Sequence, residues 1–280
     1  MAQVDLLPAG DMLSVDKALR ETEILISAGI ILSSLEAMCR PEDVEDGGLL
    51  SWRIGRTRSK RMVRGRAAKV FDLLFTPPGI QILTAMRLTA STMLLLPGSR
   101  QVKAAAAAFL AGSNVLLQLR TNYGADGSDH VNIVVCAALA ASKFFPNDEK
   151  ARNACTAFIA GQSVISYFAA GLAKVISPYW RDGSGMQGIF RTKTYGQKQV
   201  GELLQKFPWF AKAAGWSVWA GEMAFPLALL APKPIALGLL GTGVSFHAGN
   251  AAFMGLNRFL WAFSATYPAV AHHSKHLRRG

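Results

Sequence analysis

Residues 166–175 read Ser-Tyr-Phe-Ala-Ala-Gly-Leu-Ala-Lys-Val, a mostly apolar stretch with a lysine near its end. They end a long apolar run that begins near Ala154, and they place Lys174 near the C-terminal end of a predicted membrane-spanning helix. Pro178 and Gly183 follow almost at once, so the helix is expected to stop there. An ionisable side chain at the edge of hydrocarbon is costly, and by default it indicates a function. The alternative is a lysine whose amine only reaches the lipid headgroups.

The composition is typical of a membrane protein. Of the 280 residues, 51% are hydrophobic and only 17% are charged, whereas soluble proteins usually carry about 25% charged residues. The deficit lies after residue 79, where apolar runs close to the length of a bilayer span recur. The sequence therefore predicts an all-α fold, a polytopic membrane helix bundle of about six to seven spans.

The net charge of +12 is clustered rather than spread, with most of the excess in residues 52–69 and a shorter basic run at the end of the chain. Beside apolar spans, such clusters usually hold a cytoplasmic face against anionic lipid. No nucleic-acid recognition motif accompanies them, so the lipid bilayer is the expected partner and nucleic acid is not. The three cysteines form no CxxC pair, and no metal site is expected.

Six apolar segments are predicted to cross the membrane, and a seventh is left open. The six are 79–96, 103–119, 130–145, 153–176, 210–230 and 235–254. Residues 255–270 are either a further span or a re-entrant or interfacial helix, because the break near Asn257 does not decide between them.

The predicted domain organisation has three parts. Residues 1–70 hold an amphipathic helix over about 16–40 and a basic cytoplasmic arm over 52–69. Residues 71–271 form the transmembrane domain, and residues 272–280 form a basic tail.

Five ionisable side chains lie in or at the ends of the apolar segments, namely Arg87, His130, Lys174, Glu222 and His247. Each has a structural explanation on its own. Arg87 and Glu222 could form an intramembrane pair, His247 could be a satisfied core histidine, and His130 could sit at the water boundary. Together they predict a functional site, because such residues are rare in membrane spans.

Two helix faces carry the candidate residues. Tyr167, Gly171 and Lys174 are spaced i, i+4, i+7 and share a face, and Gly171 would let another helix or a flat ligand come close. His247 and Asn250 share another face one turn apart, and Arg258 lies near it if that helix is unbroken.

A lysine at a hydrocarbon boundary loses hydration, which disfavours the ammonium and suits a general base. A neighbouring histidine could hold an anionic or carbonyl group. These residues suit proton abstraction from a lipophilic phenol or quinol, or from a peptide side chain, and they do not choose between the two.

The segment from Tyr167 to Lys174, followed by Tyr179-Trp180-Arg181-Asp182-Gly183, resembles the horizontally transferred transmembrane (HTTM) family. That family includes the membrane domain of vitamin K-dependent gamma-carboxylase, which has a similar segment with two consecutive lysines, the second being its catalytic base. Here Ala173 replaces the first lysine. Phe246-His247-Ala248-Gly249-Asn250 is similar to a second family segment, and Ser128-Asp129-His130 is similar to a place where the carboxylase carries a histidine. The resemblance covers residues 72–270.

The resemblance implies a role for each candidate residue. Lys174 would be the base, with His130 and His247 positioning or stabilising the substrate. Residues expected to contribute to binding of substrate or cofactor are Tyr167, Gly171, Trp180 and Asn250. Residues expected to support the site are Arg87, Glu222 and Arg258. The cofactor that the resemblance suggests is a quinone or quinol.

The chain also departs from the carboxylase. The carboxylase has a large lumenal domain after its membrane part, whereas this sequence ends ten residues after Val270. Carboxylation of a protein substrate is therefore not expected here. Short bacterial members similar to the sporulation-delaying-protein-B type, which act in producing a secreted peptide toxin, are nearer in length. The family's site faces away from the cytoplasm, whereas counting spans from the basic arm puts Lys174 on the cytoplasmic side.

Two hypotheses from different classes stay open, both for an integral protein of a bacterial plasma membrane. In the first, the chain is a carboxylase-like enzyme that acts on a quinol or a peptide with Lys174 as general base. In the second, it is a non-catalytic scaffold or maturation factor for a secreted peptide or a larger membrane complex. That scaffold would bind its peptide or membrane-protein partner through residues 1–70.

Overall fold

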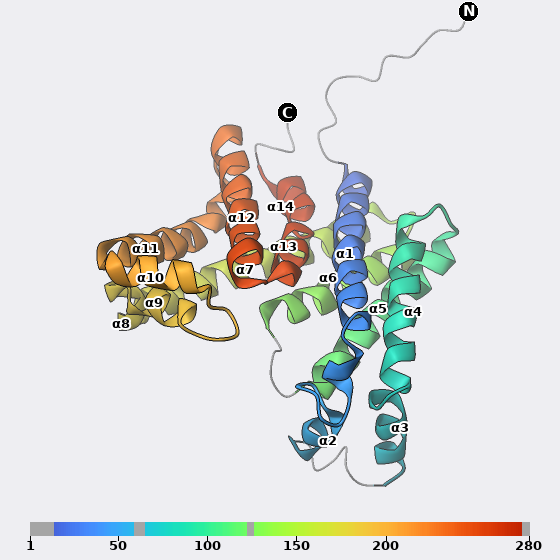
Figure 1. Cartoon of the computed structure of the whole chain (residues 1–280). Helices are drawn as coiled ribbons and strands as arrows, with labels where there is room; N and C mark the ends of the chain where they lie inside the picture. The colour runs from blue at the N-terminus through green and yellow to red at the C-terminus, as the bar shows by residue number, and fades with distance from the viewer. Residues whose placement is uncertain (1–13, 59–64, 122–125, 276–280) are drawn as a thin grey trace, which may run out of the picture. The chain divides into compact units, whose positions relative to one another are not determined.

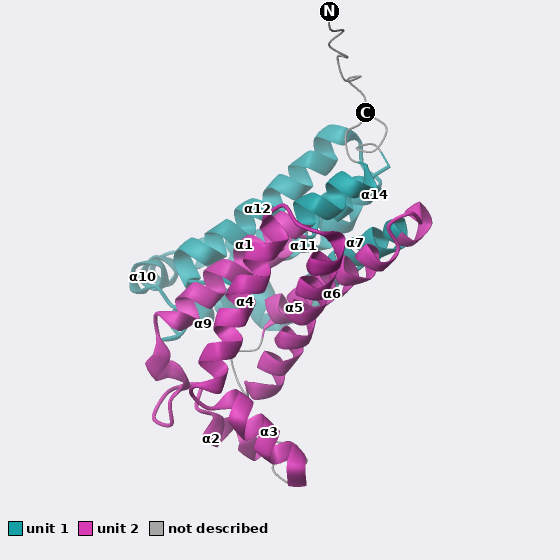
Figure 2. Ribbon diagram, turned by 90° about the vertical axis from the view of Figure 1, so that its right-hand side faces the viewer, with its two compact units in different colours: residues 1–22, 152–260, 266–280 teal, residues 23–151, 261–265 magenta. Residues whose placement is uncertain are grey.

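The computed structural model describes residues 14–58, 65–121 and 126–275, and every regular element among them is a helix (Figure 1). The predicted all-α class is therefore confirmed. The chain divides into two compact units, shown in Figure 2. Unit 1 takes in residues 152–260 and short pieces of the chain up to residue 22 and from residue 266. Unit 2 takes in residues 23–151 and 261–265. The predicted boundary at residue 70 falls inside unit 2 and stays a prediction.

Three helices form the centre of unit 2, and their bounds lie close to the first three predicted spans. They are α4 (Gly79–Leu95), α5 (Arg100–Arg120) and α6 (Gly127–Phe144). α5 packs against both of the others, and its alanine-rich first half buries Ala104 and Ala107 in these contacts. Small side chains let helix backbones come close together, which explains why this stretch faces its neighbours.

Local capping residues set where these helices begin. Pro97-Gly98 ends α4, and the Ser99 side chain accepts a hydrogen bond from the backbone N–H of Val102 at the start of α5. A capping box of Asp126 and Asp129 begins α6. The Asp126 carboxylate accepts the backbone N–H of Asp129, and the Asp129 carboxylate accepts the backbone N–H of Asp126.

The N-terminal part of unit 2 is more structured than an arm. It holds most of α1 (Val15–Met38), then η1 (Pro41–Val44), α2 (Trp52–Gly55), η2 (Arg56–Arg58) and α3 (Gly65–Phe75). Trp52 is buried, donates from Nε1 to Asp72 Oδ1 at 2.8 Å, and packs edge-on against Phe75 with ring centroids 4.7 Å apart.

The described part of the predicted basic arm is thus helical and attached to the unit. Arg56 forms an ion pair with Asp72 at 3.5 Å, and Arg120 of α5 donates from Nε to the Phe75 carbonyl at 3.1 Å. The basic residues at 60, 61 and 64 lie outside the described residues. The anchors of this stretch are apolar and acidic residues at the two ends of the basic run, namely Trp52, Asp72 and Phe75.

The main segment of unit 1 begins with α7 (Glu149–Ile176), the longest helix among the described residues. The polar stretch 177–208, for which no structure was predicted, forms α8 (Pro178–Asp182), α9 (Ser184–Phe190) and α10 (Lys198–Lys206). All three pack on α11 (Pro208–Ala224). Gly183 is required between α8 and α9, because its φ is +88° and a Cβ there would lie 2.7 Å from the Lys212 backbone nitrogen.

The last apolar region is broken into three helices. After η3 (Phe225–Leu229), α12 (Lys233–Met254) ends at Gly255, whose φ of +70° is a left-handed helix cap. α13 (Asn257–Ser264) and α14 (Tyr267–His273) follow, and each is too short to cross a bilayer. Arg258 therefore does not continue the helix of His247. The predicted basic tail also starts inside α14, and residues 276–280 lie outside the described residues.

Two of the described helices, α5 and α7, are long and apolar enough to cross a membrane. α4 and α11 contain 17 residues each, which is about 25 Å of helix. A typical hydrocarbon core of about 30 Å needs about 20 residues. Six or seven spans would require these shorter helices to cross as well.

Candidate functional site

The candidate site in unit 1 is built on one face of α7. Tyr167 and Gly171 are buried on this face, and Lys174 lies at its C-terminal end. Because seven residues of α-helix rise about 10 Å, Tyr167 and Lys174 mark two separate positions along the same face. The side chains at the two positions contact different residues.

At the first position, Lys174 forms an ion pair with Glu222 of α11. The ammonium donates to both carboxylate oxygens at 2.8 Å, and the two side chains are only 19% and 7% exposed. The Lys174 nitrogen also lies 5.1 Å from the centre of the Trp180 ring, within reach of a cation–π interaction. Lys174 is therefore held by Glu222 and Trp180 rather than extended freely toward headgroups.

Gly171 explains how α11 reaches Lys174. A Cβ at this glycine would lie 3.0 Å from both the Cβ of Glu222 and the backbone nitrogen of Met223. The space above Gly171 is thus filled by the neighbouring helix. Of the two predicted uses of this glycine, the structure shows the close approach of another helix and not a place for a flat ligand.

At the second position, Tyr167 connects two other helices through its hydroxyl. The oxygen lies 2.6 Å from Nε2 of His247 in α12, and it is also hydrogen-bonded to the hydroxyl of Tyr267 in α14. Phe225 stacks on the Tyr167 ring with centroids 3.9 Å apart. A Cβ at Gly243 would lie 2.4 Å from the Tyr267 hydroxyl, so α12 needs a glycine there to admit the tyrosine.

The remaining residues predicted for this part of the chain lie around His247. Asn250 is partly exposed, and its backbone carbonyl accepts the N–H of Leu256 at 3.2 Å in the cap of α12. Arg258 lies on α13 next to Phe259, whose ring is 6.1 Å from that of His247. The α13 residue shown next to His247 is thus Phe259, and Arg258 does not share a helix face with the histidine.

Arg87 and His130 belong to unit 2 and have partners there. Arg87 is buried and donates to Ser113 Oγ at 2.6 Å and to Asn114 Oδ1 at 2.9 Å. His130 is exposed, with its Nε2 3.0 Å from Nε2 of Gln118. Each member of the suggested pair of Arg87 with Glu222 has partners within its own unit, namely Ser113 and Asn114 for Arg87 and Lys174 for Glu222. The catalytic and supporting roles suggested for His130 and Arg87 stay predictions.

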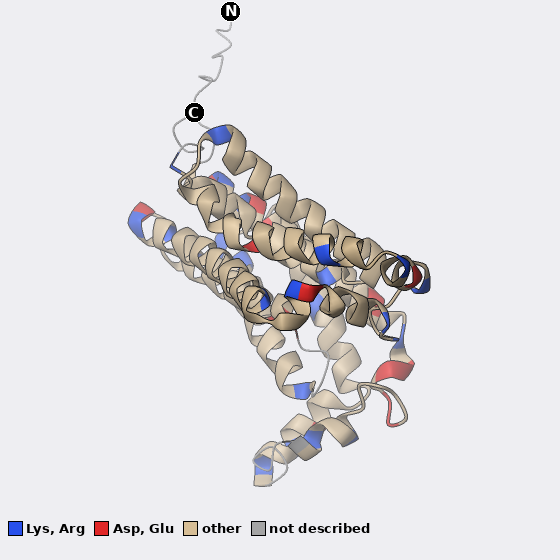
Figure 3. Cartoon of the chain, turned by 90° about the vertical axis from the view of Figure 1, so that its left-hand side faces the viewer, with Lys and Arg blue, Asp and Glu red and all other residues tan. Residues whose placement is uncertain are grey.

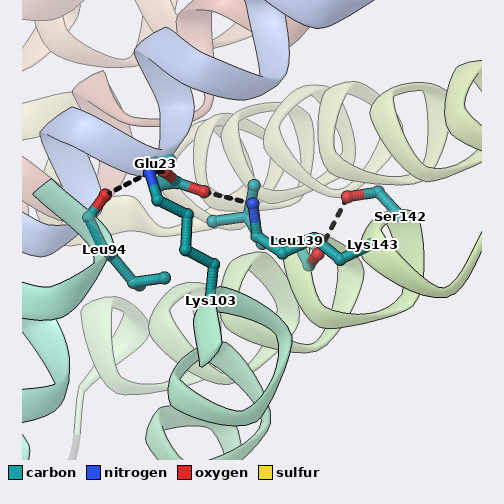
Figure 4. Close-up of polar contacts among 6 residues, drawn as sticks. All are labelled: Glu23, Leu94, Lys103, Leu139, Ser142 and Lys143. Carbon is teal, nitrogen blue, oxygen red and sulfur yellow. Dashed lines mark hydrogen bonds and ion pairs between the residues drawn. The ribbon is translucent and has the colours of Figure 1, made fainter. Parts of the chain in front are cut away.

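Unit 2 holds a second buried charge cluster that the sequence did not reveal (Figure 4). Glu23 of α1 is 2% exposed, and it pairs with Lys103 of α5 at 3.0 Å and with Lys143 of α6. Lys103 also donates to the Leu94 carbonyl at 3.0 Å. We call Glu23, Lys103 and Lys143 the α1 triad.

The α1 triad favours the charged form of its carboxylate. Burial by itself would raise the pKa of Glu23, but hydrogen bonds and charge from Lys143 and then Lys103 lower it below its ordinary value. A usable signal was present in the sequence, since Glu23 stands directly before Ile24 and Leu25 in a helical pattern of apolar residues, which Glu21 and Glu36 also interrupt. Its two partners lie 80 and 120 residues away, and spacing alone does not connect them.

We compared the chain with protein-family models, with curated protein sequences and with solved structures, and none of them matches it. Among the described residues, no group of three or more His, Cys, Asp or Glu side chains is arranged to hold a metal ion.

Proposed function

We propose that the chain is a polytopic protein of a bacterial plasma membrane, similar to the HTTM family, in which Lys174 acts as general base on a lipophilic quinol or a peptide. The observation that carries this proposal is the ion pair of Lys174 with Glu222. Lys174 lies on the same face of α7 as Tyr167, whose hydroxyl is hydrogen-bonded to His247 and Tyr267. A buried pair of titratable groups beside such a chain is a common feature of proton-transfer sites.

The surface of α7 supports a membrane location. The helix leaves large apolar side chains exposed along its length, namely Phe158, Ile165, Phe168, Leu172 and Ile176. Water-soluble surfaces rarely keep apolar residues contiguous in this way. Figure 3 shows most Lys, Arg, Asp and Glu residues near helix ends, with long uncharged stretches between them. That distribution suits helices whose middles lie in hydrocarbon.

The ion pair offers a route to a neutral amine. Exclusion of water disfavours both charges of the pair. Transfer of one proton from the Lys174 ammonium to the Glu222 carboxylate gives a neutral amine and a neutral acid. The amine can then accept a proton from the substrate, while Glu222 keeps the first one. In this scheme Glu222 is a positioning residue that also stores a proton.

A bound quinol would supply an acidic hydroxyl beside Lys174. Lys174, backed by Glu222, would take the proton of that hydroxyl. Trp180 would offer an aromatic face beside the amine, since its ring already lies 5.1 Å from the Lys174 nitrogen.

The test is mass spectrometry of the protein purified in mild detergent, with Lys174→Ala and Lys174→Arg beside wild type. We expect a co-purified quinone or related lipid in wild type and its loss, or loss of its turnover, in both variants. Lys150→Ala is the matched control, because Lys150 is an exposed lysine at the other end of the same helix. If both Lys174 variants retain the co-purified quinone or lipid and turn it over as wild type does, the proposed role of Lys174 is refuted.

A scaffold function is the second candidate, and exposed apolar side chains near the basic stretch favour it. They are Leu49, Ile54, Val70 and Leu73, and they alternate with Arg53, Arg66 and Lys69. Such a surface suits a peptide or membrane-protein partner. Under this reading, deletion of residues 1–69 abolishes function while Lys174→Ala keeps it, and complementation assays with the two variants distinguish the candidates.

A further inference from the structure

Residues 178–216 gather aromatic side chains on the surface of unit 1. They comprise α8, α9, α10 and the first half of α11, which lie together in Figure 1 and pack on one another. Tyr179 is 66% exposed and Trp209 is 69% exposed, and Phe210 and Trp216 are exposed as well. Large aromatic side chains are normally covered in water-soluble proteins. We call residues 178–216 the aromatic platform.

The aromatic platform is also basic. It contains six basic residues and two acidic ones, a net charge of +4. The basic residues are Arg181, Arg191, Lys193, Lys198, Lys206 and Lys212. This surface is therefore complementary to anionic groups as well as to apolar ones.

Several basic and aromatic side chains of the platform are paired. The Lys212 nitrogen lies 5.1 Å from the centre of the Trp216 ring, and the Lys206 nitrogen lies 5.5 Å from that of Phe207. The indole of Trp216 donates to the Arg181 carbonyl at 3.0 Å. Each pair thus combines an apolar ring with a charged head, the combination found at the boundary between hydrocarbon and headgroups.

The chain connections put the platform at such a boundary. α7 is long and apolar enough to cross a membrane, and it ends at Ile176, two residues before α8 begins. The platform must then lie on the side where α7 leaves the bilayer. It is held there as a unit, because Gly183 and Gly215 bring the backbones of α8 and α11 into close contact.

We propose that the aromatic platform rests on the anionic headgroups of the leaflet at which α7 ends. Tyr179, Trp209 and Trp216 lie at headgroup level, and the basic side chains contact lipid phosphates. This proposal rests on the membrane location within the proposed function, but it does not depend on any role of Lys174. The chemistry it requires is that of an anionic phospholipid such as phosphatidylglycerol.

The test uses the full-length protein in nanodiscs that contain phosphatidylcholine alone or with phosphatidylglycerol, each carrying a nitroxide near the headgroup. Tryptophan fluorescence is quenched by nitroxides within a short distance. We expect quenching of wild type, with most of it lost in the Trp209→Phe/Trp216→Phe double variant. Trp52→Phe is the matched control, because Trp52 is only 2% exposed, and its loss should leave the quenching unchanged.

The charge of the platform is tested with Lys206→Gln and Lys212→Gln. Wild type should be quenched more by labelled phosphatidylglycerol than by labelled phosphatidylcholine, and each change should reduce this preference by up to about fivefold, as expected for removing one basic residue near the surface. Equal quenching by the two lipids in wild type, or quenching that survives the double tryptophan change, would overturn the proposal.

Extraction of cell membranes with alkaline carbonate tests the membrane location separately from the contact between the platform and the headgroups. Release of the protein by carbonate would refute the membrane location itself. Retention of the protein together with unquenched Trp209 would refute only the platform.

Discussion

Buried charges in this chain are held in compact groups by residues that are far apart in the sequence. Lys174 and Glu222 are 48 residues apart, and Glu23 lies 80 and 120 residues from its two lysines. A buried charge left without its partner is costly, typically about 3–5 kcal/mol. The sequence shows which residues are charged within apolar segments, but the choice of partner depends on which helices meet. This is why the sequence could not identify Lys174 as the partner of Glu222.

The α1 triad should contribute strongly to stability. Glu23→Gln removes the carboxylate and leaves Lys103 and Lys143 close together without a counter-charge, so we expect a loss of about 3 kcal/mol. The thermal unfolding midpoint in detergent should fall by roughly 5 °C or more. Glu21→Gln is the control. The Glu21 side chain is 40% exposed and its ion pair with Lys17 is long, at 4.0 Å, so the change should shift the midpoint little. Equal midpoints for Glu23→Gln and wild type would contradict the role of the triad.

The same triad predicts a dependence on pH. The pKa of Glu23 is lower in the folded protein than its ordinary value of 4.5. A carboxyl group of this kind adds stability above its unfolded pKa, and that stability is lost as the pH falls through the folded pKa. The difference in unfolding midpoint between wild type and Glu23→Gln should therefore be constant near neutrality and shrink below pH 4.5. A difference that stays constant down to pH 3 would show that the charge of Glu23 does not contribute.

At the scale of elements, apolar patterning predicted the long helices well, including the helix expected over 16–40, which is α1 at Val15–Met38, and it missed the short helices of the polar stretch 177–208. The expected span 79–96 corresponds to α4 at Gly79–Leu95, because Pro78 and Pro97 punctuate the pattern on both sides. α8, α9 and α10 were missed because their polar composition resembles that of a loop. Their helical structure depends on packing against α11, which local sequence does not show.

The contact between α7 and α11 can be tested at Gly171. A Cβ in Gly171→Ala would come within 3.0 Å of Glu222 and of the Met223 backbone, so the two helices must separate and the ion pair at Lys174 must loosen. We expect a loss of stability of about 1–3 kcal/mol, measured as a lower thermal midpoint. Gly161→Ala on the same helix has open space around its Cβ, and it should be neutral or slightly stabilising, by up to about 1 kcal/mol. If the two variants behave alike, close packing at Gly171 is not important.

At the scale of the whole molecule, the number of spans determines on which side of the membrane each loop lies. With six spans, α5, α6 and α7 all cross, so residues 98 and 147 lie on one side and residue 193 lies on the other. If only α5 and α7 cross, the two described helices that are long and apolar enough to do so, residue 98 shares a side with residue 193 and not with residue 147. Relative sides therefore decide between the two arrangements without knowledge of the absolute orientation.

Single cysteines at these loops provide the measurement. Gly98→Cys, Asn147→Cys and Lys193→Cys would be made after Cys39, Cys136 and Cys155 are replaced by alanine, and intact cells would be labelled with a membrane-impermeant thiol reagent. All three sites are suitable, because Asn147 and Lys193 are exposed and a Cβ at Gly98 meets no atom within 4 Å. We expect residues 98 and 147 to label alike and residue 193 to label oppositely. Residue 231 should match residue 98 in both arrangements, so Ala231→Cys controls for access of the reagent. Matching labels at 98 and 193, with the opposite label at 147, would refute six spans, because helices such as α6 would then lie beside the bilayer core rather than across it.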